Sequence, residues 1–202
     1  MGRLKVLIIL LFIHFSTNLY SQELIYDVFV EEKPVGNLLV TQKDLDSGKV
    51  YYSALLNLEY KLFTPTKMVQ LREAIYQNDT LIQAYFVDKR NDSKIAESKI
   101  EKILSKNYYH TLMDTTKGWH EKPIINSELK LYFKKPKSRD SIFSEATHKY
   151  NRIAKLPEES RYMMVNEEGE KTIIKYNNEG ECIQHNFFIG AVEYRMKLRN
   201  GE

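Results

Sequence analysis

Residues 49–63 of this 202-residue chain read KVYYSALLNLEYKLF, and apolar or aromatic side chains occupy every second position. Successive side chains of a β-strand point to opposite faces, so the alternation predicts one long strand with a water-avoiding face. That face carries Val50, Tyr52, Ala54, Leu56, Leu58, Tyr60 and Leu62. Such a strand is much longer than the usual ~5–6 residues, so we expect it to curve strongly or to break at a bulge. Both features are typical of barrels and coiled sheets.

Period-2 alternation recurs along the rest of the chain. Near the C-terminus, Val192, Tyr194, Met196 and Leu198 alternate with charged residues, as expected for an antiparallel sheet with one wet side. Further strands are expected at residues 24–30, 37–42, 68–76, 81–88, 95–103, 108–114, 150–156, 161–166, 171–176 and 181–188, separated by turns rich in Gly, Asn and Asp. The sequence therefore predicts an all-β fold, a strongly curved antiparallel sheet or open β-barrel of about ten to twelve strands with one or two short helices.

The middle of the chain is less regular. Asn126 or Ser127 could cap a short helix, but Leu129, Leu131 and Phe133 equally alternate as a strand would. Residues 141–149 are similarly ambiguous. No fixed-period repeat or linker divides the chain into two domains.

The first 21 residues have the layout of a secretory signal peptide. Arg3 and Lys5 form a positive start, residues 6–13 are an unbroken apolar run, and small polar residues follow up to Ser21. The run is well below the ~20 residues that a membrane span needs, which disfavours the alternative of an uncleaved anchor. We predict cleavage after Ser21, one β-rich domain over residues 22–202, and a location in the periplasm, with secretion as the alternative. After cleavage, we expect that the remaining chain is not an integral membrane protein.

Composition excludes several classes of protein. The formal net charge is +3, and the predicted signal peptide contains Arg3 and Lys5 but no acid, so the remainder is close to neutral. Neither the charge nor the expected export favours a nucleic-acid partner. A single Cys rules out an intrachain disulfide framework and a Cys-rich zinc site.

No catalytic or metal-binding motif stands out. His110, His120, His148 and His185 have neither the His-Glu-x-x-His pattern nor the i, i+2 spacing that a strand would need. Cys182 lies three residues from His185, so in a strand the two side chains point to opposite faces. The chain has no Gly-x-Ser-x-Gly turn and no Gly-rich phosphate loop. We therefore predict a protein that is not an enzyme, with no catalytic residue, metal or cofactor.

Tyrosine is the most suggestive residue type, with 14 in the chain. Tyr residues along the inner face of a curved sheet would suit a partly wet cavity for an amphiphile, although tyrosine also favours exposed sheets by propensity. Tyr52, Leu56 and Tyr60 are the candidate ligand-binding residues. Leu56, at the centre of the strand, should lie deep and serve mainly packing. Tyr52 and Tyr60, nearer the ends, should meet ligand with an apolar ring and a wet hydroxyl.

A basic cluster is the strongest local charge feature. It comprises Lys130, Lys134, Lys135, Lys137 and Arg139. One interpretation is a patch for anionic lipid, lipopolysaccharide or polysaccharide, and the other is a solvated loop around Pro136. Acidic residues resume at Asp140 and Glu145, which favours the loop.

Several short motifs resemble a known family. Residues 26–30 (YDVFV) and 33–38 (KPVGNL) are similar to the opening hairpin of a family of exported Gram-negative proteins of unknown function. Leu131-Tyr132-Phe133 with Pro136, residues 141–145 (SIFSE) and the Glu168-Gly169 turn are similar to later parts of that family. The resemblance implies a curved antiparallel sheet or incomplete barrel, with a fold-level likeness to the lipoprotein carriers LolA and LolB, and implies no catalytic residue.

Two functions fit these observations. The first is a non-catalytic binding or carrier module for an apolar or amphiphilic ligand, because an open barrel of long strands encloses a cavity. The alternative is a structural or protein-interaction module of the cell envelope without a small ligand. An unfilled apolar cavity would favour the first, and a filled inner face the second. A hydrolase would need clustered acids or a triad that the sequence does not reveal.

Overall fold

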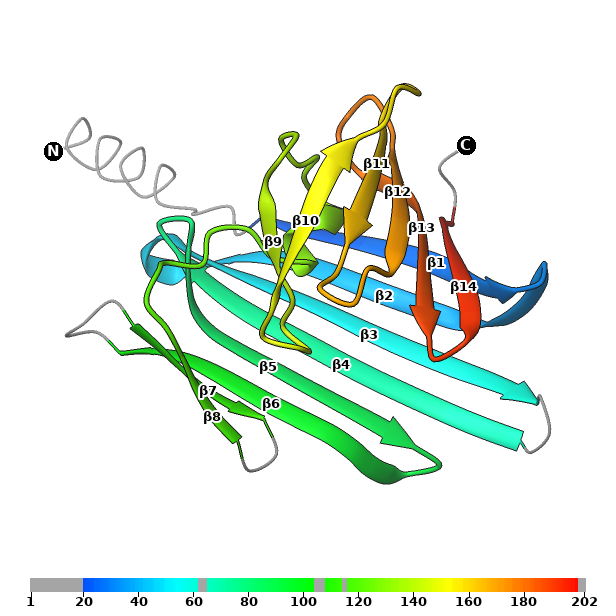
Figure 1. The fold of residues 1–202 in the computed structure, drawn as a ribbon, viewed down its shortest axis with the longest axis horizontal. Helices are drawn as coiled ribbons and strands as arrows, with labels where there is room; N and C mark the ends of the chain where they lie inside the picture. Colours follow the sequence, from blue (N-terminus) through cyan, green and yellow to red (C-terminus); the bar gives the residue numbers. More distant parts are fainter. Residues whose placement is uncertain (1–19, 62–64, 104–107, 114–115, 200–202) are drawn as a thin grey trace, which may run out of the picture.

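The computed structural model describes residues 20–61, 65–103, 108–113 and 116–199, which form a single antiparallel sheet of fourteen strands (Figure 1). The long first half contains β1 (Ser21–Val30), β2 (Lys33–Leu45), β3 (Lys49–Lys61), β4 (Pro65–Gln77), β5 (Thr80–Arg90) and β6 (Ser93–Ile103), followed by the hairpin of β7 (Tyr108–Met113) and β8 (Thr116–His120). The second half contains β9 (Ser141–Phe143), β10 (Tyr150–Lys155), β11 (Arg161–Val165), β12 (Lys171–Tyr176), β13 (Cys182–Ile189) and β14 (Val192–Leu198).

Strand order follows the sequence with one interruption. Consecutive strands pair with each other except β8 and β9, which form the two edges of the sheet, and β1 also pairs with β14. The sheet is therefore an open, barrel-like meander. Figure 1 shows the short strands β9–β12 standing across the long strands β1–β4. The predicted all-β, antiparallel and open architecture is confirmed.

Two-residue turns join several of the long strands. Glu31 and Glu32, Asn78 and Asp79, and Asn91 and Asp92 all have positive φ, between 47° and 65°. Turns of this kind match the right-handed twist of the strands that they connect, and Asn and Asp tolerate the left-handed region better than most residues. The turn residues identified in the sequence thus determine the hairpin register.

The long strand curves without breaking. β3 pairs with β4 without a register shift from Lys49, opposite Gln77, to Lys61, opposite Pro65. Register shifts occur in other pairs, at Val28/Phe29 between β1 and β2, Ile75/Tyr76 between β4 and β5, Asp88/Lys89 between β5 and β6, and Lys175/Tyr176 between β12 and β13. Of the two alternatives that the sequence left open for β3, the structure therefore selects curvature.

The predicted inward face of β3 is the buried one. Tyr52, Ala54, Leu56 and Leu58 are buried in the core, and Val50 and Tyr60 are partly buried against it. Leu62 lies outside the described residues. Across the pair, Gly36 of β2 faces Leu58, and a Cβ at Gly36 would lie 1.9 Å from the backbone oxygen of Asn57. The glycine of the Val35-Gly36 motif therefore allows β2 and β3 to approach closely.

The chain between β8 and β9 fills part of the interior. We call residues 124–133 the inner segment. It buries Ile124, Leu129, Leu131 and Tyr132 in the same core cluster as the inward residues of β3 and β4. The amide of Leu81 donates to the carbonyl of Ile124 at 2.8 Å, and the amide of Glu128 donates to the carbonyl of Phe143 at 3.0 Å. These bonds fasten the inner segment to both halves of the sheet.

The structure resolves the ambiguity of the middle region. Leu129–Tyr132 forms a short 3₁₀ helix, η2, and not a strand; a second, η1, spans Asp46–Gly48. The N-cap of η2 is Glu128, with no side-chain capping bond, so neither Asn126 nor Ser127 caps the helix as proposed. Ser127 instead accepts a hydrogen bond from the Tyr76 hydroxyl at 2.6 Å.

The number of strands and the start of the first strand can also be compared with the sequence-based expectations. The fourteen strands exceed the expected ten to twelve because β8 and β9, of five and three residues, are too short to give a period-2 signal. The predicted signal peptide lies outside the described residues except for Tyr20 and Ser21, and Ser21 is the first residue of β1. Among the described residues, no helix is both long and apolar enough to cross a membrane.

Candidate functional site

A cavity of about 210 Å³ lies between the two halves of the sheet. The first half of the sheet contributes Leu38, Ala54 and Leu56, and the second half contributes Met164, Phe187 and Met196, so much of the lining is apolar. Polar residues of the lining come mainly from β4, the inner segment, β10 and the turns after β9 and β11, and they include Gln70, Arg72, Glu128, Ser144, Thr147, Lys149, Asn151, Asn166, Glu168 and Glu170. The cavity therefore has an apolar wall and a polar one.

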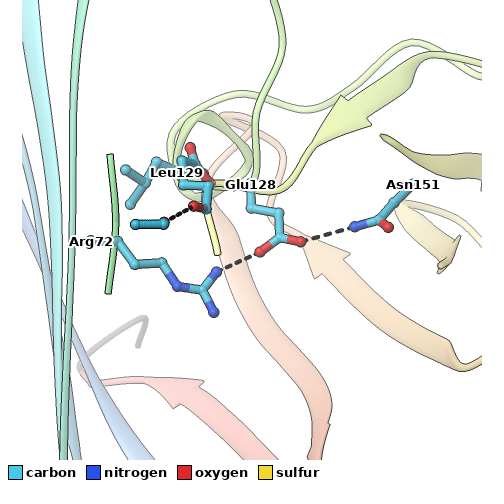
Figure 2. Close-up of polar contacts among 6 residues, drawn as sticks. Arg72, Glu128, Leu129 and Asn151 are labelled. Carbon is cyan, nitrogen blue, oxygen red and sulfur yellow. Dashed lines mark hydrogen bonds and ion pairs between the residues drawn. The ribbon is translucent and has the colours of Figure 1, made fainter. Parts of the chain in front are cut away.

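Three polar side chains on this wall are linked to one another by an ion pair and a hydrogen bond. Arg72 of β4 forms an ion pair with Oε2 of Glu128, at the start of η2, through its Nη1 atom. The other oxygen of Glu128, Oε1, accepts a hydrogen bond from Nδ2 of Asn151 on β10 at 2.9 Å. Figure 2 shows how these contacts link Arg72, on a long strand, to Asn151, on a short strand, through Glu128. Glu128 thus connects the two halves of the sheet through the inner segment.

Glu145 is a second carboxylate close to these three side chains. It is completely buried, and its Oε1 accepts the backbone N–H of Leu129 at 3.4 Å. Its Oε2 has no hydrogen-bond partner among the described residues. Burial, with the negative charge of Glu128 as the next cause, raises the pKa of the Glu145 carboxyl to about 7. Glu145 therefore changes charge near neutral pH, beside the helix that carries Glu128.

Two residues of β13, His185 and Cys182, differ in whether they line the cavity. His185 lines the cavity, and burial, followed by the charge of Arg72, lowers its pKa to about 3, so the imidazole is neutral at physiological pH. Cys182 is buried, and its burial raises the pKa of the thiol to about 12. Since the thiolate is the nucleophilic form, such a thiol is poorly suited to covalent chemistry.

No group of three potential metal-ligating His, Cys, Asp or Glu side chains occurs in the part of the chain that the structure describes. The cavity lining offers two ion pairs, Arg72–Glu128 and Lys149–Glu168, together with amide and hydroxyl groups and a neutral imidazole. These groups can bind and orient a ligand through hydrogen bonds and charge.

The structure does not bring the three predicted ligand-binding residues together. Leu56 lines the cavity. Tyr52 packs in the core, with its ring centroid 5.6 Å from that of Tyr76 and 5.9 Å from that of Phe133. Tyr60 contacts Tyr194, at 6.1 Å between centroids, and borders a separate shallow depression near the β3–β4 connection. Leu56 therefore reaches the cavity from the core, whereas Tyr52 packs in the core and Tyr60 lies at a different place on the sheet.

Sequence reasoning missed Arg72, Glu128, Glu145 and Asn151. Arg72 had a visible signal, because it and Gln70 interrupt the otherwise apolar inward positions of β4, which include Met68, Ala74 and Tyr76. A charged residue on a buried face requires a partner. The position of that partner, 56 residues further on at Glu128, could not be read from the local pattern.

Comparison with known proteins gives a fold and a family. A search of curated proteins finds no match. The chain is similar to a solved structure from Brucella abortus, described as a beta-barrel-like protein of domain of unknown function DUF1849, with a TM-score of 0.59. The two are 9% identical, and the similarity covers 88% of this chain and 94% of the other, so it shows the fold alone.

This likeness supports the barrel-like architecture, whereas the suggested likeness to LolA and LolB is not confirmed. The resemblance to a family of unknown function is confirmed, since a family model described as domain of unknown function DUF6134 matches residues 26–199, which is most of the chain. The chain therefore belongs to the DUF6134 family.

Proposed function

We propose that the protein is an exported, non-catalytic module that binds a small apolar or amphiphilic ligand in the cavity between the two halves of the sheet. One observation carries the proposal: the same cavity combines an apolar wall, including Leu38, Leu56 and Met196, with the Arg72–Glu128 pair. Ligand sites are commonly concave and mostly apolar, with a few placed polar groups. The predicted signal peptide supports a periplasmic location.

The polar wall favours a ligand with a hydrogen-bonding or anionic end. A guanidinium group has five N–H donors, and among the described residues Glu128 is the only carboxylate that pairs with Arg72. In this proposal the remaining donors of Arg72 bind a carboxylate or hydroxyl of the ligand. The apolar part of the ligand would then contact Leu56 and Met196, where each Å² of apolar surface removed from water contributes about 25 cal/mol.

The size of the cavity limits the ligand. At about 210 Å³ it is smaller than the roughly 300–1,000 Å³ of typical drug-sized pockets. The inner segment occupies the space that a wider barrel would leave open. We therefore expect a single short acyl chain or one ring system, and not a lipid with two long chains.

Isothermal titration calorimetry with octanoate tests the proposal. Octanoate has one short chain and one carboxylate, and it should bind saturably with a stoichiometry of one. Leu56→Trp fills the cavity from β3 and should weaken binding at least tenfold. Leu55→Trp is the matched control, because Leu55 is on the outer face of the same strand and should leave binding unchanged.

A further variant distinguishes this site from the one expected from sequence. Tyr60→Phe should bind octanoate as the unmodified protein does, because Tyr60 lies outside the cavity lining. Thermal unfolding of each variant verifies that it is folded. Lack of saturable binding, or equal effects of the Leu55 and Leu56 substitutions, would contradict the proposal.

A specific observation also favours the second function, a structural or protein-interaction module. The inner segment fills much of the inner face, as that alternative requires. The same titrations discriminate between the two functions, because a structural module has no reason to bind octanoate in a way that depends on Leu56.

A further inference from the structure

A second cavity, of about 290 Å³, lies where the β4–β5 turn meets the chain between the inner segment and β9. Its charged lining consists of Lys130, Lys134, Lys135, Lys137, Asp79 and Asp140. It shares no lining residue with the cavity between the two halves of the sheet. Four of the five residues in the basic cluster noted in the sequence therefore surround one hollow.

Lys130 is a fixed positive charge at the base of this cavity. Its side chain is only 8% exposed, and its Nζ donates to Oδ1 of Asp79 and to the carbonyl of Ile125, each at 3.0 Å. The same ammonium group lies 4.4 Å from the ring centroid of Tyr76. The hydrogen bond and charge of Lys130 lower the pKa of Asp79, which therefore stays ionised and is neutralised by this pair.

The second acid of the lining serves the backbone. Oδ2 of Asp140 accepts the backbone N–H of Lys137 at 2.8 Å, and the N–H of Asp140 donates to the carbonyl of Lys137 at 3.2 Å. The neighbouring Arg139 donates its N–H to the carbonyl of Ile153 on β10 at 3.0 Å, and Pro136 is buried. Its backbone bonds thus hold the turn against the sheet, while the side chains of Lys137 and Arg139 are exposed to solvent.

Three lysines remain without a carboxylate partner. Among the described residues, Lys134, Lys135 and Lys137 form no salt bridge, and the Nζ of Lys135 has only a 3.4 Å hydrogen bond to Oγ of Ser160. Lys134 and Lys137 are exposed at the cavity. Several unneutralised ammonium groups around one hollow produce a positive potential that attracts a multiply charged anion.

We propose that this cavity is an anion site that binds the phosphate group of a phosphate monoester, either in a small soluble molecule or in a lipid headgroup. Lys134 and Lys137 provide the flexible ammonium groups, and Lys130 offsets the negative charge of Asp79 beside them. Lysine is suited to this role because it binds phosphate as a point charge from any direction. The proposal is independent of ligand binding in the other cavity.

Equilibrium binding of inorganic phosphate at low ionic strength, followed by amide chemical shifts, tests the site. We expect saturable shifts in residues 134–140 that weaken as sodium chloride is added, since exposed charges are screened by salt. The double variant Lys134→Gln/Lys137→Gln should bind at least tenfold more weakly. The control Lys155→Gln/Lys171→Gln removes two exposed lysines on β10 and β12 that line neither cavity, and it should bind phosphate normally.

Vesicle flotation separates the two sources of phosphate. Vesicles of phosphatidylcholine with phosphatidic acid that retain the unmodified protein, but not the Lys134/Lys137 variant, would assign the site to a lipid headgroup. Phosphate binding without vesicle binding would assign it to a soluble ester. The proposal is overturned by the absence of saturable phosphate binding, or by equal weakening in the control variant, which would reflect net charge alone.

Discussion

Two positions on β3, four residues apart on the same face, show how differently one strand can be used. Tyr52 is packed between the rings of Tyr76 and Phe133, whereas Leu56 lines a cavity. The alternation that places both side chains inward is identical. The difference is in what lies opposite, because the inner segment covers Tyr52 with Phe133, while Leu56 faces the space beside Arg72 and Glu128. Periodicity therefore predicts which residues face inward, and distant chain segments determine whether they pack or line a cavity.

The largest expected effects test this contrast directly. Leu58 is fully packed, with 1% exposure, and lines neither the cavity between the two halves of the sheet nor the second cavity beside Lys130. Leu58→Ala should lower the free energy of unfolding by about 4 kcal/mol, towards the upper end for large-to-small core substitutions. Leu56→Ala should cost only about 2–3 kcal/mol, because part of the leucine surface already faces empty space. Urea unfolding measures both, and equal losses would show that the cavity does not persist in solution.

A second prediction concerns the buried carboxyl beside the cavity. The folded-state pKa of Glu145, about 7, lies above its ordinary value of 4.5, so folding favours the protonated form. The associated stability is fully present below pH 4.5 and is lost as the pH rises through 7, to a total of about 3 kcal/mol. Glu145→Gln should abolish this loss.

The variant should therefore match the unmodified protein near pH 4 and exceed its stability at pH 8. Urea unfolding across this pH range provides the measurement. Glu179→Gln, at an exposed site that lines neither cavity, is the control and should keep the difference in stability between pH 4 and pH 8. A profile for Glu145→Gln that is parallel to that of the unmodified protein would show that Glu145 is not the titrating group.

These contrasts indicate how much could be predicted from the sequence. The inward face of β3 followed from Tyr52, Ala54, Leu56 and Leu58, because period-2 burial is a local property of a strand. The turns followed from residues such as Asn78 and Asp79, whose side chains tolerate positive φ. Pairing of β1 with β14, and the open edges at β8 and β9, depend on how the curved sheet closes, which no local pattern encodes.

The candidate site was much less predictable. Its charged wall combines Arg72 on β4, Glu128 in the inner segment and Asn151 on β10, which are brought together only by folding. The assignment of Tyr52 as a ligand contact assumed that strand ends lie near an open mouth. Phe133 of the inner segment occupies that place instead, and its position depends on a 3₁₀ helix that the sequence pattern did not distinguish from a strand.

A third prediction compares the effects of one core substitution on stability and on ligand binding. Cys182 is buried away from the cavity lining. Cys182→Ser places a hydroxyl in this apolar site and should lower the free energy of unfolding by about 1–2 kcal/mol. Because the thiol does not contact the cavity, octanoate binding should be unchanged. Loss of binding in a variant that unfolds at a normal temperature would instead show that Cys182 takes part in function.

The smallest expected effect concerns a single hydrogen bond within the packed region. The Tyr26 hydroxyl donates to the carbonyl oxygen of Cys182 at 2.6 Å, and its ring contacts Tyr132 of the inner segment at 5.6 Å between centroids. Tyr26→Phe keeps the ring contact and removes only the buried hydrogen bond, so the free energy of unfolding should fall by about 1 kcal/mol.

Tyr85→Phe is the matched control, because the Tyr85 hydroxyl donates to Glu97 on the outer face of the sheet, where water can replace it. Urea unfolding should therefore show a clear loss for Tyr26→Phe and almost none for Tyr85→Phe. If the two losses were equal, water would have to reach the Tyr26 hydroxyl, and the core around Tyr26 and Tyr132 would be less tightly packed than their ring contact indicates.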